Sequence, residues 1–195
     1  MDINAQEDLC LKEGEEFSFM PLSSSQLPHP TIKESVTFFG GSFYPFHQGH
    51  RACLDLCPEK NIVVVMDRNP QKEIRDFLPY DEYIIIKSQL KNTPYLVYPG
   101  FLGSRKTNPT CTWLPLVTIA EKNLLMGDDS FMNFLTWQSP EIILEAITKL
   151  YVVPRNFSLE ECRNQQKKLN KINPRVKIIF LDDHPFKDIS STKLR

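Results

Sequence analysis

The chain has 195 residues and a formal net charge of −1, and 41% of its residues are hydrophobic, which is enough for one domain with a proper core. The near-neutral charge and the lack of a strong Lys/Arg run argue against a nucleic-acid-binding protein, because such proteins are held by contacts with phosphates. No apolar run approaches the length of a membrane span, so a transmembrane protein is not expected.

The N-terminus and the cysteines indicate the compartment. The acidic start MDINAQEDLC lacks the basic and apolar regions of a secretion signal. The cysteines are odd in number, scattered and without C-x-x-C spacing, which is typical of reduced thiols; they are Cys10, Cys53, Cys57, Cys111 and Cys162. We therefore expect a soluble, cytoplasmic protein.

The first 34 residues differ in composition from the rest. They are polar and net acidic, with PLSSSQLPHP near their end, and this composition predicts a flexible N-terminal extension. After it, strand-like and helix-like segments alternate. We expect an extension over residues 1–34 followed by one domain over residues 35–195.

The alternation predicts the fold class. Short β-rich or apolar runs predict strands over residues 36–39, 61–66, 95–98, 124–126, 150–153 and 176–181. Helices are predicted over residues 80–90, 140–147 and 158–169, the second opened by Ser139 as N-cap and Pro140, the third by a Ser158/Glu161 capping box. Such an α/β pattern implies a Rossmann-like, doubly wound parallel sheet with helices on both faces.

The segment VTFFGGSFYPFHQGH, residues 36–50, is the strongest candidate for a site. It reads as a strand, a glycine turn and a helix start at which His47 and His50 share one face, with Gly49 between them. Two imidazoles beside the free N–H groups of a helix N-terminus form a site for a phosphate.

Other interpretations of the histidines exist. A lone H-x-x-H pattern can equally belong to the surface or the core. Zinc is a second alternative, because Cys53 and Cys57 recur at helical spacing with His47 and His50. One straight helical face cannot wrap a tetrahedral ion, so the phosphate site is preferred and no protein-held metal is expected.

The end of the chain adds a second candidate. Ligands of parallel sheets collect at the carboxyl ends of the strands, and ISSTKLR follows the last predicted strand. Ser190, Ser191 and Thr192 can donate from hydroxyl and N–H groups, and Arg195 offers a guanidinium fork for phosphate oxygens. An ordinary helix cap is the alternative interpretation.

Together these residues resemble a known family. GGSFYPFHQGH and ISSTKLR are similar to the H-x-G-H and I-S-S-T-x-x-R signatures of the nucleotidyltransferase superfamily, which includes adenylyl- and cytidylyltransferases. The segment LMGDDSFMNFLTWQSPEIILEAITKLYVVPRN is similar to the corresponding segment of bacterial nicotinate-nucleotide adenylyltransferases. NPQK resembles their proline-x-lysine loop, and PTCTWLPL is an incomplete match to their P-S-Y-T-x-x-T-L motif. The resemblance covers about residues 36–195.

The resemblance implies a reaction and a set of roles. Nicotinate mononucleotide, or its nicotinamide counterpart, would attack the α-phosphate of ATP and release pyrophosphate, with Mg²⁺ held mostly by phosphate oxygens and water. The implied catalytic residues are His47, His50 and Arg195. The implied ATP-binding residues are Gly40, Gly41, Ser42, Gly49, Gly127, Asp129, Ser191 and Thr192. The implied mononucleotide-binding residues are Lys72, Thr112, Trp137 and Arg155.

Three of these residues have structural alternatives, and the sequence departs from the family pattern elsewhere. Asp129 could cap a helix, Trp137 could belong to the core, and Lys72 could be solvated. Tyr44 stands where the family usually has Asp, Pro115 replaces a helix-starting Thr, and the chain stops at Arg195, where relatives continue. An active adenylyltransferase of NAD biosynthesis is favoured; the alternative is a degenerate member that binds nucleotide or a protein partner without turnover. The oligomeric state stays open.

Overall fold

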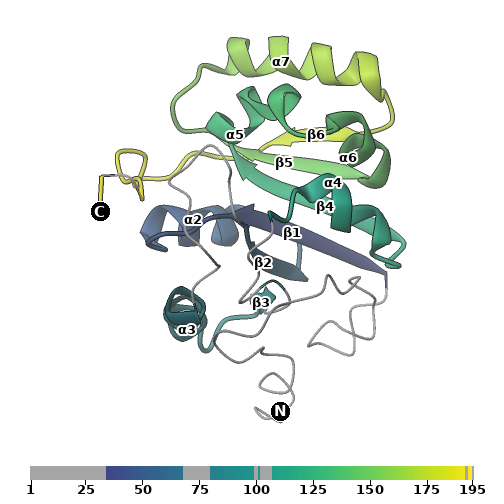
Figure 1. Cartoon of the computed structure of the whole chain (residues 1–195). Coiled ribbons are helices and arrows are strands. Elements are labelled where there is room, and N and C mark those ends of the chain that lie inside the picture. The colour runs from purple at the N-terminus through teal and green to yellow at the C-terminus, as the bar shows by residue number, and fades with distance from the viewer. Residues whose placement is uncertain (1–33, 68–79, 99–100, 102–106, 192, 195) are drawn as a thin grey trace.

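The computed structural model describes residues 34–67, 80–98, 101, 107–191, 193 and 194. Within them, one parallel six-stranded sheet has the order β3-β2-β1-β4-β5-β6 (Figure 1). Its strands are β1 Ser35–Gly41, β2 Ile62–Met66, β3 Leu96–Tyr98, β4 Glu121–Gly127, β5 Lys149–Val153 and β6 Lys177–Phe180. This order confirms the Rossmann-like, doubly wound sheet predicted from the alternation.

Helices connect the strands and flank the sheet. They are α2 Gln48–Leu56, α3 Tyr80–Gln89, α4 Thr110–Trp113, α5 Asp128–Met132, α6 Pro140–Ala146 and α7 Leu159–Ile172, with 3₁₀ turns η1 Leu114–Leu116 and η2 Phe134–Thr136. The chain moves outward from β1 to β3 and then from β4 to β6. Because such crossovers are right-handed, the helices of the two halves cover opposite faces.

The central strands owe their place to burial. All five residues of β2 are buried, and Val36, Phe38, Leu124 and Leu150 are at most 4% exposed. Strands covered on both faces read as continuous apolar runs, which is why residues 61–66 could be recognised. β1 and β4 extend beyond their predicted ranges because backbone pairing continues into Gly41 and Gly127.

Both predicted N-caps are present, but they differ in geometry. At α7, Ser158 and Glu161 form the predicted capping box. At α6, Ser139 is the predicted N-cap before Pro140, but its φ is +47° and its side chain makes no capping hydrogen bond. With φ in the left-handed region, Ser139 lacks the extended backbone from which a cap side chain reaches the first helical N–H groups.

The sheet order determines where the site lies. The chain reverses its direction of winding between β1 and β4, so the loops after these strands diverge and leave a crevice at their carboxyl ends. The C-terminal segment runs from β6 back across this end of the sheet toward α2 (Figure 1). The first and last candidate motifs of the sequence therefore meet.

Candidate active site

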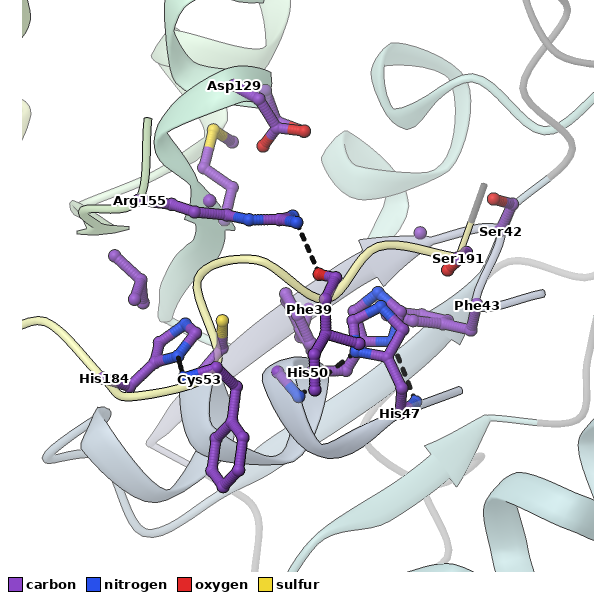
Figure 2. A pocket seen from close by; sticks show the side chains of 18 of the residues that line it. Phe39, Ser42, Phe43, His47, His50, Cys53, Asp129, Arg155, His184 and Ser191 are labelled. Carbon is purple, nitrogen blue, oxygen red and sulfur yellow. Dashed lines mark hydrogen bonds between the residues drawn. The ribbon is translucent and has the colours of Figure 1, made fainter. Parts of the chain in front are cut away.

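One pocket lies at the carboxyl ends of β1, β4 and β5 (Figure 2). The turn after β1, the first turns of α2 and α5, and the C-terminal segment all line it. Of the residues predicted from the sequence, it brings together Gly40, Gly41, Ser42, His47, Gly49, His50, Gly127, Asp129, Arg155 and Ser191.

Aromatic packing shapes the turn between β1 and α2. Phe43 is 2% exposed, has a φ of +46°, and packs against Phe39, with ring centroids 5.1 Å apart. A Cβ atom at Gly41 would come within 2.9 Å of the Phe43 ring. The missing side chain at Gly41 therefore lets the ring fold back over the strand end, and Phe43 also contacts His50 edge-on at 5.0 Å.

The two histidines form a reciprocal cap on α2. Nδ1 of His47, the N-cap, accepts the amide N–H of Gly49 at 3.1 Å, and Nδ1 of His50 accepts the amide N–H of His47 at 3.3 Å. A nitrogen that accepts a hydrogen bond carries no proton, so in its neutral form each imidazole holds its proton on Nε2. The two rings stack with centroids 3.7 Å apart. In its neutral form each ring therefore carries an N–H donor on Nε2 beside the helix N-terminus.

His47 is neutral at physiological pH. Burial lowers the pKa of its imidazole to about 4, and the positive charge of Arg155 and the nearby His184 act in the same direction. Such a side chain contributes a hydrogen-bond donor rather than a charge.

The C-terminal segment closes one side of the pocket. The Ser191 hydroxyl donates to the Pro45 carbonyl at 3.0 Å, which joins the ISST motif to the loop before α2. The Ser190 carbonyl accepts hydrogen bonds from the amide N–H groups of Lys193 and Leu194 in a turn. Thr192 and Arg195 lie outside the described residues, as does Lys72.

Comparisons with known proteins agree with this arrangement. The family model of cytidylyltransferase-like proteins matches residues 38–195, which include every element described above except the start of β1. The chain belongs to the cytidylyltransferase-like family.

Three curated relatives of this chain carry the same name. A probable nicotinate-nucleotide adenylyltransferase of Aquifex aeolicus is 31% identical over 166 residues, covering 80% of this chain and 98% of the relative. A protein of the same name from Caldicellulosiruptor bescii is 28% identical over 169 residues, covering 82% and 84%. A third, from Dictyoglomus turgidum, is 29% identical over 170 residues, covering 82% and 81%.

Two site residues of this cytidylyltransferase-like chain were missed by sequence reasoning. Asp128 is fully buried, and its Oδ2 accepts the amide N–H groups of Arg155, Asn156 and Phe157 at 2.6, 2.6 and 2.9 Å. Its neighbour Asp129 is exposed and lines the pocket. The N-cap of α5 is Gly127, so the alternative of Asp129 as a helix cap does not hold. A single strand-end Asp-Asp pair indicates a site without telling which carboxylate faces inward.

The second missed residue is His184, which is 6% exposed and lines the pocket. Its Nδ1 accepts the amide N–H of Phe186 at 3.1 Å, so its neutral form also carries the proton on Nε2. Burial, together with the charges of Arg155 and Lys187, lowers its pKa. The only sequence signal was its position a few residues before ISST.

Two predicted mononucleotide residues do not line this pocket. Thr112 is exposed on α4, where its hydroxyl donates to the Pro109 carbonyl at 2.8 Å. Trp137 is half-buried and packs against Phe134, with ring centroids 5.0 Å apart. Their role in mononucleotide binding stays a prediction.

Within the described ranges, no group of three or more His, Cys, Asp or Glu side chains could hold a metal ion. The Cys53 thiol is buried, and burial raises its pKa to about 12, so it is a poor source of the thiolate that zinc binds. In the same part of the chain, no helix is long and apolar enough to cross a membrane.

The depressed pKa of His47 predicts a pH dependence of stability. Between about pH 6.5 and pH 4 the unfolded chain binds a proton that the folded chain does not, so stability falls as the pH falls through this window. We expect His47→Asn to keep the helix cap, because Asn is a good N-cap, and to lose less stability than wild type between pH 7 and pH 5. Urea unfolding at both pH values measures this; equal losses would contradict it.

Proposed function

We propose that the chain is an adenylyltransferase of NAD biosynthesis that joins nicotinate mononucleotide to the AMP moiety of ATP and releases pyrophosphate. The observation that carries the proposal is the juxtaposition of the His47/His50 pair with Ser191 at the N-terminus of α2. Imidazole N–H donors, a hydroxyl and a helix dipole converge there, and together they fit a polyphosphate. The names of the relatives support the choice of substrate.

The proposed chemistry needs positioning more than proton transfer. An oxygen of the mononucleotide phosphate forms a bond to the α-phosphorus of ATP, while the bond from that phosphorus to the bridging oxygen of pyrophosphate breaks. The attacking oxygen is already anionic, so no general base is required. Catalysis then depends on in-line alignment and on donors that stabilise charge on the α-phosphate and the leaving group.

Each proposed role follows from a position in the pocket or in the motif. His47 and His50 donate from Nε2 to the ATP phosphates, with His50 acting on the α-phosphate in the transition state. Ser191, and Thr192 and Arg195 from the same motif, hold the β- and γ-phosphates. Mg²⁺ arrives with the nucleotide as MgATP, coordinated by phosphate oxygens and water.

The glycine-containing segments after β1 and β4 are proposed to contact the phosphates and the ribose of ATP. Gly40, Gly41, Ser42 and Gly49 let the phosphates approach the main chain. A Cβ at Gly49 would lie 3.1 Å from the His47 ring and 3.4 Å from the Phe186 carbonyl oxygen. Gly127 and Asp129 lie at the end of β4, where the exposed Asp129 carboxylate suits the ribose hydroxyls. Lys72, Thr112, Trp137 and Arg155 are proposed for the mononucleotide.

A pyrophosphate-release assay tests the proposal directly. The full chain is incubated with MgATP and a panel of mononucleotides, including those of nicotinate, nicotinamide and cytosine. Release that requires nicotinate or nicotinamide mononucleotide is expected. No release with any of them, combined with ATP binding by calorimetry, would overturn the enzymatic proposal in favour of a nucleotide-binding member without turnover.

The proposed stacking of Trp137 on the pyridine ring gives a prediction about selectivity. Trp137→Ala should raise KM for the mononucleotide by about two- to tenfold and leave KM for ATP nearly unchanged, because aromatic stacking contributes about 0.5–1.5 kcal/mol beyond buried area. Trp137→Phe is the matched control and should keep most of the affinity. If Trp137→Ala instead unfolds, as circular dichroism would show, the ring that packs on Phe134 belongs to the core.

A further inference from the structure

The segment that carries the ISST motif is held over the pocket without regular secondary structure. After β6 ends at Phe180, the chain passes through residues 181–191 with no further strand or helix. His184, Phe186, Ile189 and Ser191 of this segment line the pocket. Its position therefore depends on individual contacts rather than on a ladder of backbone hydrogen bonds.

One side chain supplies two of those contacts. Arg155 Nε donates to the Lys187 carbonyl at 2.5 Å, and its guanidinium NH₂ group donates to the Ile189 carbonyl. Figure 2 shows the guanidinium reaching from the end of β5 to this segment. A planar guanidinium presents donors in a fixed fork, so two carbonyls two residues apart can be held in one geometry.

The base of Arg155 is itself fixed. Its backbone N–H donates to the buried carboxylate of Asp128 at 2.6 Å, and Asp128 follows β4 directly. A continuous chain of contacts thus runs from the sheet through Asp128 and Arg155 to residues 187–189, and through Ser191 to the Pro45 carbonyl.

We propose that Arg155 is a positioning residue that latches the C-terminal segment over the nucleotide pocket, and thereby aligns Ser191 and the ISST motif with the His47/His50 pair. In this role the guanidinium acts through the segment, and removing it loosens the segment even when no ligand is bound. A residue that only contacts ligand phosphate would leave the ligand-free segment unchanged.

Hydrogen exchange of the ligand-free chain separates these roles. The amides of Phe186 and Ile189 are hydrogen-bonded within the segment. In Arg155→Met, their protection should fall at least about tenfold, because two hydrogen bonds from a charged group are lost, while the amides of β4 and β5 keep theirs. Arg155→Lys, which offers one point charge instead of a fork, should give an intermediate loss. Arg163→Met, an exposed arginine of α7, is the matched control and should change neither.

A second measurement rests on the proposed function. Calorimetry should show MgATP binding weakened about tenfold in Arg155→Met, since a loosened segment must be ordered on binding, and KM for MgATP should rise. Unchanged exchange at residues 186–189 would overturn the latch whatever the activity. Lost protection across β4 and β5 in both Arg155 variants would also overturn it, by showing a general structural role. If Arg155→Met loosens the segment but the wild-type chain releases no pyrophosphate, the latch stands and the enzymatic proposal is rejected.

Discussion

Replacing His50 with alanine is expected to lower the rate of pyrophosphate release by about 10²–10³-fold, which corresponds to a loss of about 2.7–4 kcal/mol of transition-state stabilisation. The His50 imidazole lies in the first turn of α2, stacked on His47, and its neutral form carries the donor proton on Nε2. Its proposed contact with the α-phosphate strengthens as negative charge develops there, so the loss should appear mainly in kcat.

The structure also indicates a cost in stability for His50→Ala. Nδ1 of His50 accepts the amide N–H of His47 as half of the capping box, and losing a cap costs about 0.5–2 kcal/mol. His50→Gln is the matched control, because a glutamine at this position of a capping box can accept the same N–H. We expect His50→Gln to keep the stability and still lose most of the turnover. Wild-type turnover in His50→Ala would remove the catalytic assignment.

Replacing Asp128 with alanine is expected to lower the free energy of unfolding by about 3 kcal/mol, since leaving buried hydrogen-bonding groups unsatisfied costs about 1–3 kcal/mol each. Oδ2 of Asp128 accepts three amide N–H groups from the loop after β5, and the residue is fully buried. Without it these donors face a cavity, and the loop that carries Arg155 loses its anchor.

Two variants sharpen this prediction. Asp128→Asn keeps one acceptor oxygen in place without the charge and should cost about 1 kcal/mol, the difference between a charged and a neutral acceptor. Asp129→Ala removes the same charge at the exposed neighbouring position and should change stability by less than about 0.5 kcal/mol. Urea unfolding measures all three; equal effects of Asp128→Ala and Asp129→Ala would show that the buried carboxylate anchors nothing.

Much of the fold and part of the site could be predicted from local patterns. The continuous apolar run that became β2 and the capping box of α7 each have their cause within a few residues of sequence. The placement of His47 and His50 at a helix start is local in the same way, because it depends on the turn before the helix and on helical spacing. Parallel strands then bring their carboxyl ends to one edge, which predicted that GGSFYPFHQGH and ISST would meet.

The remaining features depend on partners far away in the sequence. Asp128 binds amides 27 to 29 residues later, and Arg155 binds carbonyls 32 and 34 residues later; pairs at such separations leave no periodic signal. The packing of the loops after β4 and β5 decides that Asp128, and not Asp129, is buried. The same packing decides that the Arg155 guanidinium donates to backbone carbonyls. The sequence by itself thus determined the class of the sheet and the histidine pair, because caps and apolar periodicity are local. Only the tertiary structure decided the neutral state of His47, the position of His184 in the pocket and the latch at Arg155. Burial and long-range hydrogen bonds exist only once the chain has folded.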